Sequence, residues 1–224
     1  MMRIERLVVV MVAALTVAPI AVAVIVDGVA ISVGNKVITR SEIDQRIRLA
    51  AFQSGVQPDM GGASRREAAQ RLIEQKLIAR EMDLGHYPRR DANAGQAMLA
   101  AYAKANFGGD ETALKTRAAE YGLTPAEVGA ELVWQSDFLT FLNLRFRPAV
   151  QVTEEQIRKY FAEKFAARVP AGQQESSLSE LHAQIEEQLT IEGSDRELDV
   201  WLKDQRQRTR IDFVEKDLQE QGAK

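Results

Sequence analysis

The pattern of hydrophobic positions is clearest over residues 124–148, where it predicts one long helix. Thr124 is a typical N-cap, Pro125 suits the first helical position, and Glu127 completes a capping box. Pro148 ends the segment, so the helix measures about 34 Å at ~1.5 Å per residue. One apolar stripe follows the helix: Val128, Leu132, Leu139, Leu142 and Phe146.

Three aromatic residues beside this stripe make the helix unusually apolar. Trp134, Phe138 and Phe141 widen the apolar arc to roughly 180°, whereas an ordinary amphipathic helix has about 100°. Either several helices surround such a helix, or part of its aromatic surface is left for a partner. The three aromatic residues therefore form a candidate binding groove, which Met98 and Tyr102 of an alanine-rich helix could complete. Core packing is the alternative interpretation.

The residues before the long helix predict a β-hairpin followed by four shorter helices. Residues 25–33 and 36–38 have strand character and flank a Gly-Asn pair that suits a tight turn. The first three helices have predicted N-terminal caps, and glycines end the third and fourth. The caps are Thr39, Ser64 and Asp91, and the stops are Gly108, Gly109 and Gly122.

Beyond the long helix, Thr153 caps a sixth helix, and a linker-like interval over residues 169–177 precedes a last helical region. The apolar stripe of that region changes face near Gly193, so the helix either bends there or rotates onto new partners. The two stripes are Leu178, Leu181, Ile185 and Leu189, then Ile191, Leu198 and Leu202. Residues 211–214 alternate like a short strand, and residues 215–224 form a polar tail.

The first 23 residues are typical of an export signal. Two arginines precede an apolar run, and Ala21-Val22-Ala23 provides an A-x-A cleavage site, so the mature chain is expected to begin near Val24. An uncleaved membrane anchor is the alternative, because apolar residues continue through Val26 and approach the ~20 that span a bilayer. Both interpretations place the rest of the chain outside the cytoplasm.

Composition and charge exclude several functional classes. Hydrophobic residues make up 46% and charged residues 27% of the chain, as in globular proteins. The net charge of −3 provides no basic field for nucleic acid. The chain has no cysteine, which excludes thiol catalysis, disulfides, zinc–thiolate sites and lipidation of an N-terminal cysteine.

The sequence offers no enzyme signature and predicts no metal or cofactor. Its two histidines, His86 and His182, lie in a turn and on a helix, without further ligands at metal-binding spacing. His182 has Glu186 at i+4, which could support a surface pair. The paired glycines at 61–62 and 108–109 lack the Lys and Ser/Thr of a phosphate loop.

Four segments, taken in order, resemble the SurA family of periplasmic chaperones. They are VDGVAISVGNKVITRSEIDQRI at 26–47, RLIEQKLIAREM at 71–82, RFRPAVQVTEEQIRKYFAEKF at 145–165, and LHAQIEEQLTIEGSDRELDVWLKDQRQRTRIDFV at 181–214. The resemblance covers nearly all of residues 25–214. It implies a mainly α fold, a multi-helix chaperone core whose N-terminal β-hairpin is completed by the short C-terminal strand.

The resemblance also has one large gap. In the family, parvulin-type prolyl isomerase domains usually follow the sixth helix, but here only the short stretch AARVPAGQQESS separates Phe165 from Leu178. Isomerase residues of the family therefore have no positions in this chain. The expected organisation is a helical chaperone domain over 24–168, a linker over 169–177 where that domain would be inserted, and a closing helix and strand over 178–214.

Three functions are compatible with these features. The resemblance implies an ATP-independent periplasmic chaperone that binds unfolded envelope proteins, such as outer-membrane β-barrel precursors, without isomerase activity. A non-catalytic envelope adaptor with one fixed partner is the main alternative, and a degenerate prolyl isomerase is a third. Neither nucleic acid nor a cofactor is expected, and membrane contact is expected only if the N-terminal segment is retained.

Overall fold

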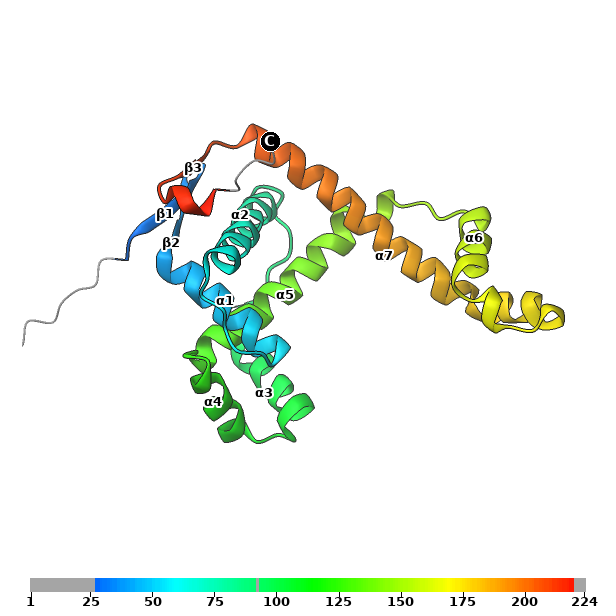
Figure 1. Ribbon diagram of the computed structural model, residues 1–224, viewed down its shortest axis with the longest axis horizontal. Coiled ribbons are helices and arrows are strands. Elements are labelled where there is room, and N and C mark those ends of the chain that lie inside the picture. The colour runs from blue at the N-terminus through cyan, green and yellow to red at the C-terminus, as the bar shows by residue number, and fades with distance from the viewer. Residues whose placement is uncertain (1–26, 92, 220–224) are drawn as a thin grey trace, which may run out of the picture.

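The fold is mainly α, as the sequence predicts. The computed structural model describes residues 27–91 and 93–219, and in this part the chain forms seven α-helices and one small antiparallel sheet. Figure 1 shows three parts: a body of helices next to the sheet, a two-helix lobe below it, and an arm that extends to the right. The predicted export signal over residues 1–23 lies outside the described residues.

The small sheet joins the two ends of the described chain. Strands β1 (Val29–Val33), β2 (Lys36–Thr39) and β3 (Ile211–Phe213) are ordered β2-β1-β3, so the predicted C-terminal strand does complete the hairpin. Gly34 takes a φ of +60° in the predicted turn, a conformation that glycine adopts without a steric cost. A third strand matters because two short strands alone are marginally stable.

The helices follow the predicted order. They are α1 (Arg40–Ser54), α2 (Gly62–Leu84), α3 (Ala94–Phe107), α4 (Glu111–Glu120), α5 (Pro125–Arg145), α6 (Glu154–Lys164) and α7 (Gln174–Arg208). Thr39, Thr124 and Thr153 cap α1, α5 and α6, each in a capping box. Two other predicted caps are wrong. Ser64 lies inside α2 and bonds to Asp59, and α3 begins after Asn93 rather than at Asp91.

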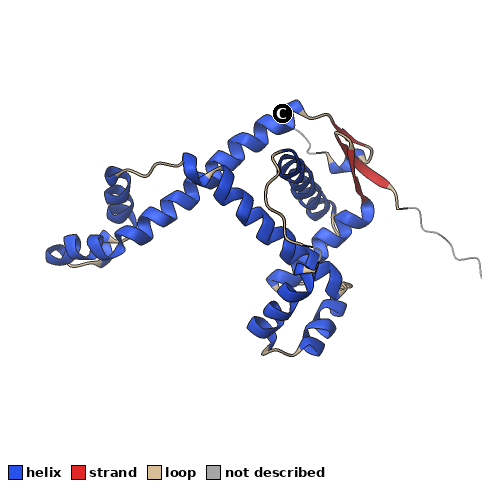
Figure 2. Cartoon of the chain, turned by 180° about the vertical axis from the view of Figure 1, so that it is seen from behind, coloured by secondary structure: helices blue, strands red, loops and turns tan. Residues whose placement is uncertain are grey.

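Helix α5 crosses the body from the lobe to α7 (Figures 1 and 2). Its ends are buried as predicted, since Val128 lies in the lobe and Phe146, the C-cap residue, in the body. The predicted stripe is interrupted at Leu139, which is 58% exposed. The helix therefore contacts different partners along its length rather than one continuous layer.

The buried hydrophobic residues of the described part of the chain form three clusters. The main core lies between the sheet, α1, α2, α5 and the second half of α7. A second cluster fills the lobe, where α3 and α4 pack against the end of α1 and the start of α5. A third cluster joins α6 to the first half of α7 and forms the arm.

Helix α7 runs without interruption through Gly193 and connects arm and body. Its apolar stripe rotates onto new partners, since Ile185 is buried against α6 and Leu198 in the main core. Ile191, predicted for the second stripe, is 45% exposed, because Gly193 and Ser194 occupy the buried face at that level. The predicted polar tail also needs correction, because Leu218 is buried against α2. None of the described helices is both long and apolar enough to span a bilayer.

Candidate functional site

Phe141, one of the residues of the candidate binding groove, is a core residue, in agreement with the alternative interpretation. Its side chain is 0% exposed and lies edge-on to Tyr87, Phe146 and Trp201, at centroid distances of 5.0, 5.5 and 6.0 Å. Tertiary packing encloses it because α7 crosses the end of α5 at Trp201. Phe141 therefore offers no surface to a binding partner.

The side chains of Trp134 and Phe138 are partly exposed to solvent. Their rings stack at a centroid distance of 6.1 Å and an interplanar angle of 15°, and both pack from the outside against the main core. The two rings form a partly exposed aromatic step on α5. This step is the part of the predicted aromatic surface that remains accessible.

The two predicted residues of α3 do not join this aromatic step. Tyr102 belongs to the lobe, where its ring lies 6.2 Å from both Phe52 and Phe107. Met98 is partly buried on the same helix and contributes to none of the three clusters. The structure therefore separates Met98 and Tyr102 from Trp134 and Phe138, and the single groove predicted from all five residues does not form.

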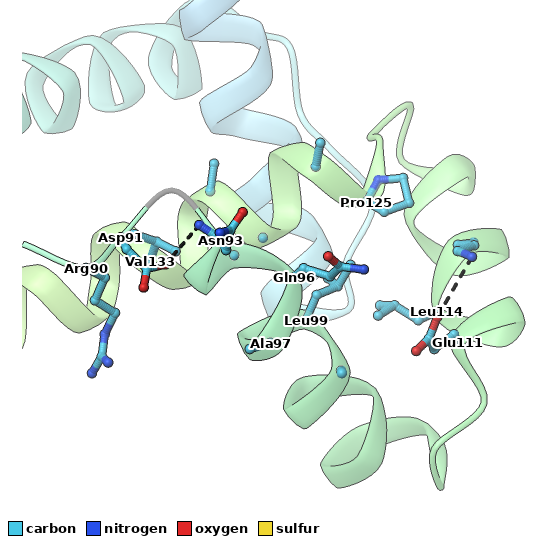
Figure 3. Close-up of a pocket in the computed structure, with 16 residues that line it drawn as sticks. Arg90, Asp91, Asn93, Gln96, Ala97, Leu99, Glu111, Leu114, Pro125 and Val133 are labelled. Atoms are coloured by element: carbon cyan, nitrogen blue, oxygen red, sulfur yellow. Dashed lines mark hydrogen bonds and ion pairs between the residues drawn. The ribbon is translucent and has the colours of Figure 1, made fainter.

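A different groove, of about 950 Å³, lies between α3, α4 and the first half of α5 (Figure 3). Its apolar lining consists of small or medium-sized side chains rather than aromatic ones: Gly95, Ala97, Leu99, Ala100, Leu114, Ala126, Gly129, Ala130 and Val133. Because these side chains are short, the groove is wide enough for bulky side chains of another molecule. We refer to it as the lobe groove.

The lobe groove owes its floor to a close crossing of α3 and α5. A Cβ atom at Gly129 would lie 3.0 Å from the carbonyl oxygen of Gly95, so both helices come together at backbone level. Small residues permit such close approach, and the neighbouring alanines then leave space above the crossing. Helix α4 forms the opposite wall through Leu114, which is buried.

The charges at the rim of the lobe groove are balanced. Arg90 and Asp91 lie at one end, where Arg90 donates to the Ser136 hydroxyl at 2.6 Å and Asp91 accepts from a backbone amide. Glu111 and Lys115 lie at the other end as an ion pair of 3.9 Å (Figure 3). Two cations and two carboxylates leave the rim of the groove without a dominant charge.

A smaller hollow of about 160 Å³ lies beside Trp134, between α1, α2 and α5, and its lining is charged. Arg46 pairs with Glu131 at 2.8 Å, and Lys76 pairs with Glu42 at 2.6 Å. Glu131 is only 6% exposed and also accepts from Gln135. The first pair joins α1 to α5 and the second joins α1 to α2, both beside Trp134.

The two histidines lie in separate parts of the fold. His182 pairs across the arm with Glu154 of α6, at 2.9 Å, rather than with Glu186 on its own helix. His86 is exposed in the turn after α2. Within residues 27–91 and 93–219, no three His, Cys, Asp or Glu side chains come together in a way that could hold a metal ion.

Comparison with known proteins adds no family assignment. Neither the scan against protein-family models nor the search of curated proteins found a match.

The sequence pattern did not predict the lobe groove, although it contains a signal for it. Ala126, Ala130 and Val133 recur at helical spacing on α5, and Gly129 lies among them, on the face opposite the large apolar residues that dominated the pattern.

Proposed function

We propose that this protein is an ATP-independent periplasmic chaperone that binds unfolded envelope or outer-membrane proteins, without prolyl isomerase activity. The observation that carries the proposal is the lobe groove, an open hollow of about 950 Å³ with a largely apolar lining. Apolar surface that remains accessible on a monomer usually marks a place where another molecule binds.

The lining of the lobe groove supports binding of many different segments rather than one fixed partner. Short side chains leave room for guest side chains of several shapes, and the balanced rim selects for neither acidic nor basic sequences. The aromatic step formed by Trp134 and Phe138 offers a second apolar contact on the same helix, and Ala130 borders both places. Aromatic side chains of an unfolded β-barrel precursor are guests of suitable size.

The proposed lack of isomerase activity follows from the connection between α6 and α7. Only residues 165–173 separate these helices, which is far shorter than an isomerase domain. The periplasmic location rests on the sequence of the first 23 residues. The SurA-like order of the four sequence segments, with β3 closing the hairpin, agrees with the same proposal.

The test uses aggregation assays with several unrelated unfolded proteins and a blocked lobe groove. Ala97 is exposed within the groove, so A97R places a long charged side chain there without burying it. We expect A97R to weaken client binding about tenfold, equivalent to ~1.4 kcal/mol. The matched control is A119R, on the exposed face of α4 away from the groove, which should bind as the parent does.

The outcomes separate the candidate functions. Suppression of aggregation for several clients, lost in A97R alone, supports the chaperone. No activity with any unfolded client would favour the envelope adaptor instead. Acceleration of proline isomerisation in a tetrapeptide above the uncatalysed rate would contradict the non-enzymatic proposal.

A further inference from the structure

The two halves of helix α7 belong to two separate hydrophobic clusters. Its buried face changes from one side of the helix to the other near Gly193. Ile185 belongs to the arm cluster and Leu198 to the main core, with no buried large side chain between them on α7. In both views, α6 and the first half of α7 extend away from α1–α4 (Figures 1 and 2). At the level of Gly193, the buried face of α7 is therefore formed by glycine and serine rather than by a large side chain.

The local sequence at this level weakens the helix. Glycine inside a helix is less favourable than alanine, and Gly/Ser pairs are among the usual positions of helix kinks. Here Gly193 is followed by Ser194, whose hydroxyl donates to the carbonyl oxygen of Thr190 at 2.8 Å. Such a bond to residue i−4 favours bending. Two features that promote a bend thus coincide where α7 changes partners.

The segment that joins α5 to α6 contacts α7 at this point. The segment over residues 147–153, which we name the strap, runs from α5 to α6 and crosses α7 at Gly193. A Cβ atom at Gly193 would lie 2.4 Å from Cγ1 of Val150, so the Val150 side chain rests directly on the glycine backbone. Arg147 of the strap also donates two hydrogen bonds to the Glu187 carboxylate on α7, one of 2.9 Å.

The strap is anchored in both cores. Phe146, just before it, is buried in the main core, and Val152 packs against the arm cluster. The strap therefore connects the two cores and crosses α7 at Gly193. A bend of α7 away from the strap would separate Val150 from Gly193.

The geometry points to a latched hinge: α7 bends at Gly193-Ser194, and the strap, through Val150 and the Arg147–Glu187 pair, holds the arm in the position seen here. A bend of about 20° would displace the start of α7 by about 10 Å, because ~29 Å of helix separate Gln174 from Gly193. Release of the strap changes the position of the arm relative to the body without unfolding either core.

The test uses the full chain and measures the distance between one spin label on the arm and one on the body. Since the protein has no cysteine, K159C on α6 and Q53C on α1 provide unique labelling positions, and both side chains are exposed. The parent should give one narrow distance distribution. V150G removes the latch contact, so its distribution should broaden or shift by up to about 10 Å.

A second substitution identifies the position of the bend. G193A added to V150G restores helix propensity where no Val150 side chain remains to collide with it, so the distribution should narrow again. R147Q removes only the ion pair and should broaden the distribution less than V150G. R71Q removes a surface pair within α2 and should have no effect.

The hinge is overturned if V150G and R147Q both retain the narrow distribution of the parent. It is also overturned if V150G broadens the distribution but G193A does not narrow it, because the motion then arises elsewhere. Circular dichroism and melting of each variant show whether α7 and the body remain folded. If V150G does not fold, R147Q with and without G193A gives the same comparison.

Discussion

The body and the arm share α7 but are stabilised in different ways. The body encloses Phe141 among three aromatic rings and buries the Arg46–Glu131 pair between α1 and α5. The arm has one small cluster around Ile157 and Phe161, and its ion pairs are exposed. This contrast indicates that the body determines whether the protein folds, whereas the arm can open or unfold by itself.

The largest expected effect is in the body, at Phe141. F141A removes a fully buried ring and should lower the free energy of unfolding by about 4 kcal/mol, because it leaves a cavity among rigid neighbours. Urea denaturation followed by Trp fluorescence measures this loss. F138A, at a partly buried position, is the matched control and should cost clearly less. A loss under about 1 kcal/mol for F141A would contradict its place in the core.

The second largest effect on the free energy of unfolding is expected at the buried ion pair of Arg46 and Glu131. E131A leaves Arg46 buried without its carboxylate, and the Nε atom of Arg46 already has no partner among the described residues. We expect a loss of about 3 kcal/mol in the free energy of unfolding. E67A, which breaks the exposed Glu67–Arg71 pair on α2, should cost under about 1 kcal/mol. Equal losses in the two variants would remove the distinction between buried and exposed pairs.

The third effect should be confined to the arm. F161A removes the buried ring that joins α6 to α7. It should destabilise the arm by about 2–3 kcal/mol, at or below the lower limit for a Phe-to-Ala change, because the small cluster can collapse. Hydrogen exchange should show loss of protection in α6, while the amides of α1 and α2 keep theirs. Equal loss of protection in arm and body would show that the two unfold together.

The smallest effect concerns the strap and depends on pH. Hydrogen bonds from the Arg147 guanidinium hold the pKa of the Glu187 carboxyl below its ordinary value of 4.5. A lowered pKa stabilises the folded arm above pH 4.5, and this contribution is lost as the pH falls through the folded-state value. Exchange protection of the arm should therefore be constant from about pH 7 to 5 and decrease in more acidic solution.

The matched variant for the pH experiment is E187Q, which cannot titrate at this position. It should show the weaker protection at every pH and lose the part of the pH dependence that arises from the strap. Since both partners are exposed, the effect of E187Q is expected to be smaller than that of F161A. An unchanged acid dependence in E187Q would assign it to other carboxylates.

Much of the fold could be predicted because the relevant signals are local. Thr39, Thr124 and Thr153 begin helices through capping boxes that involve residues three positions apart, and Gly34 permits the hairpin turn. Even β3 was predictable from alternation over four residues. The rotation of the stripe along α7 was also visible, although sequence could not decide between a bend and a change of partners.

The candidate site was harder to predict because burial depends on residues distant in the chain. Phe141 and Phe138 have similar patterns in the sequence, but Trp201 encloses Phe141 from another helix, and Phe138 keeps an exposed edge. The lobe groove arises where Gly95 meets Gly129, and neither glycine alone marks a site. A large apolar residue attracts attention in a sequence, whereas the space left by small residues does not.

The sequence by itself determined the order of the helices, the starts of α1, α5 and α6, the closing strand and the mainly α class, because caps, turns and hydrophobic periodicity act over a few residues. Only the tertiary structure decided which apolar faces are covered. It enclosed Phe141, separated Tyr102 from the aromatic step, opened the lobe groove and placed the strap on Gly193. The physical reason is that a side chain is buried by whatever packs against it, and packing joins segments that sequence periodicity does not connect.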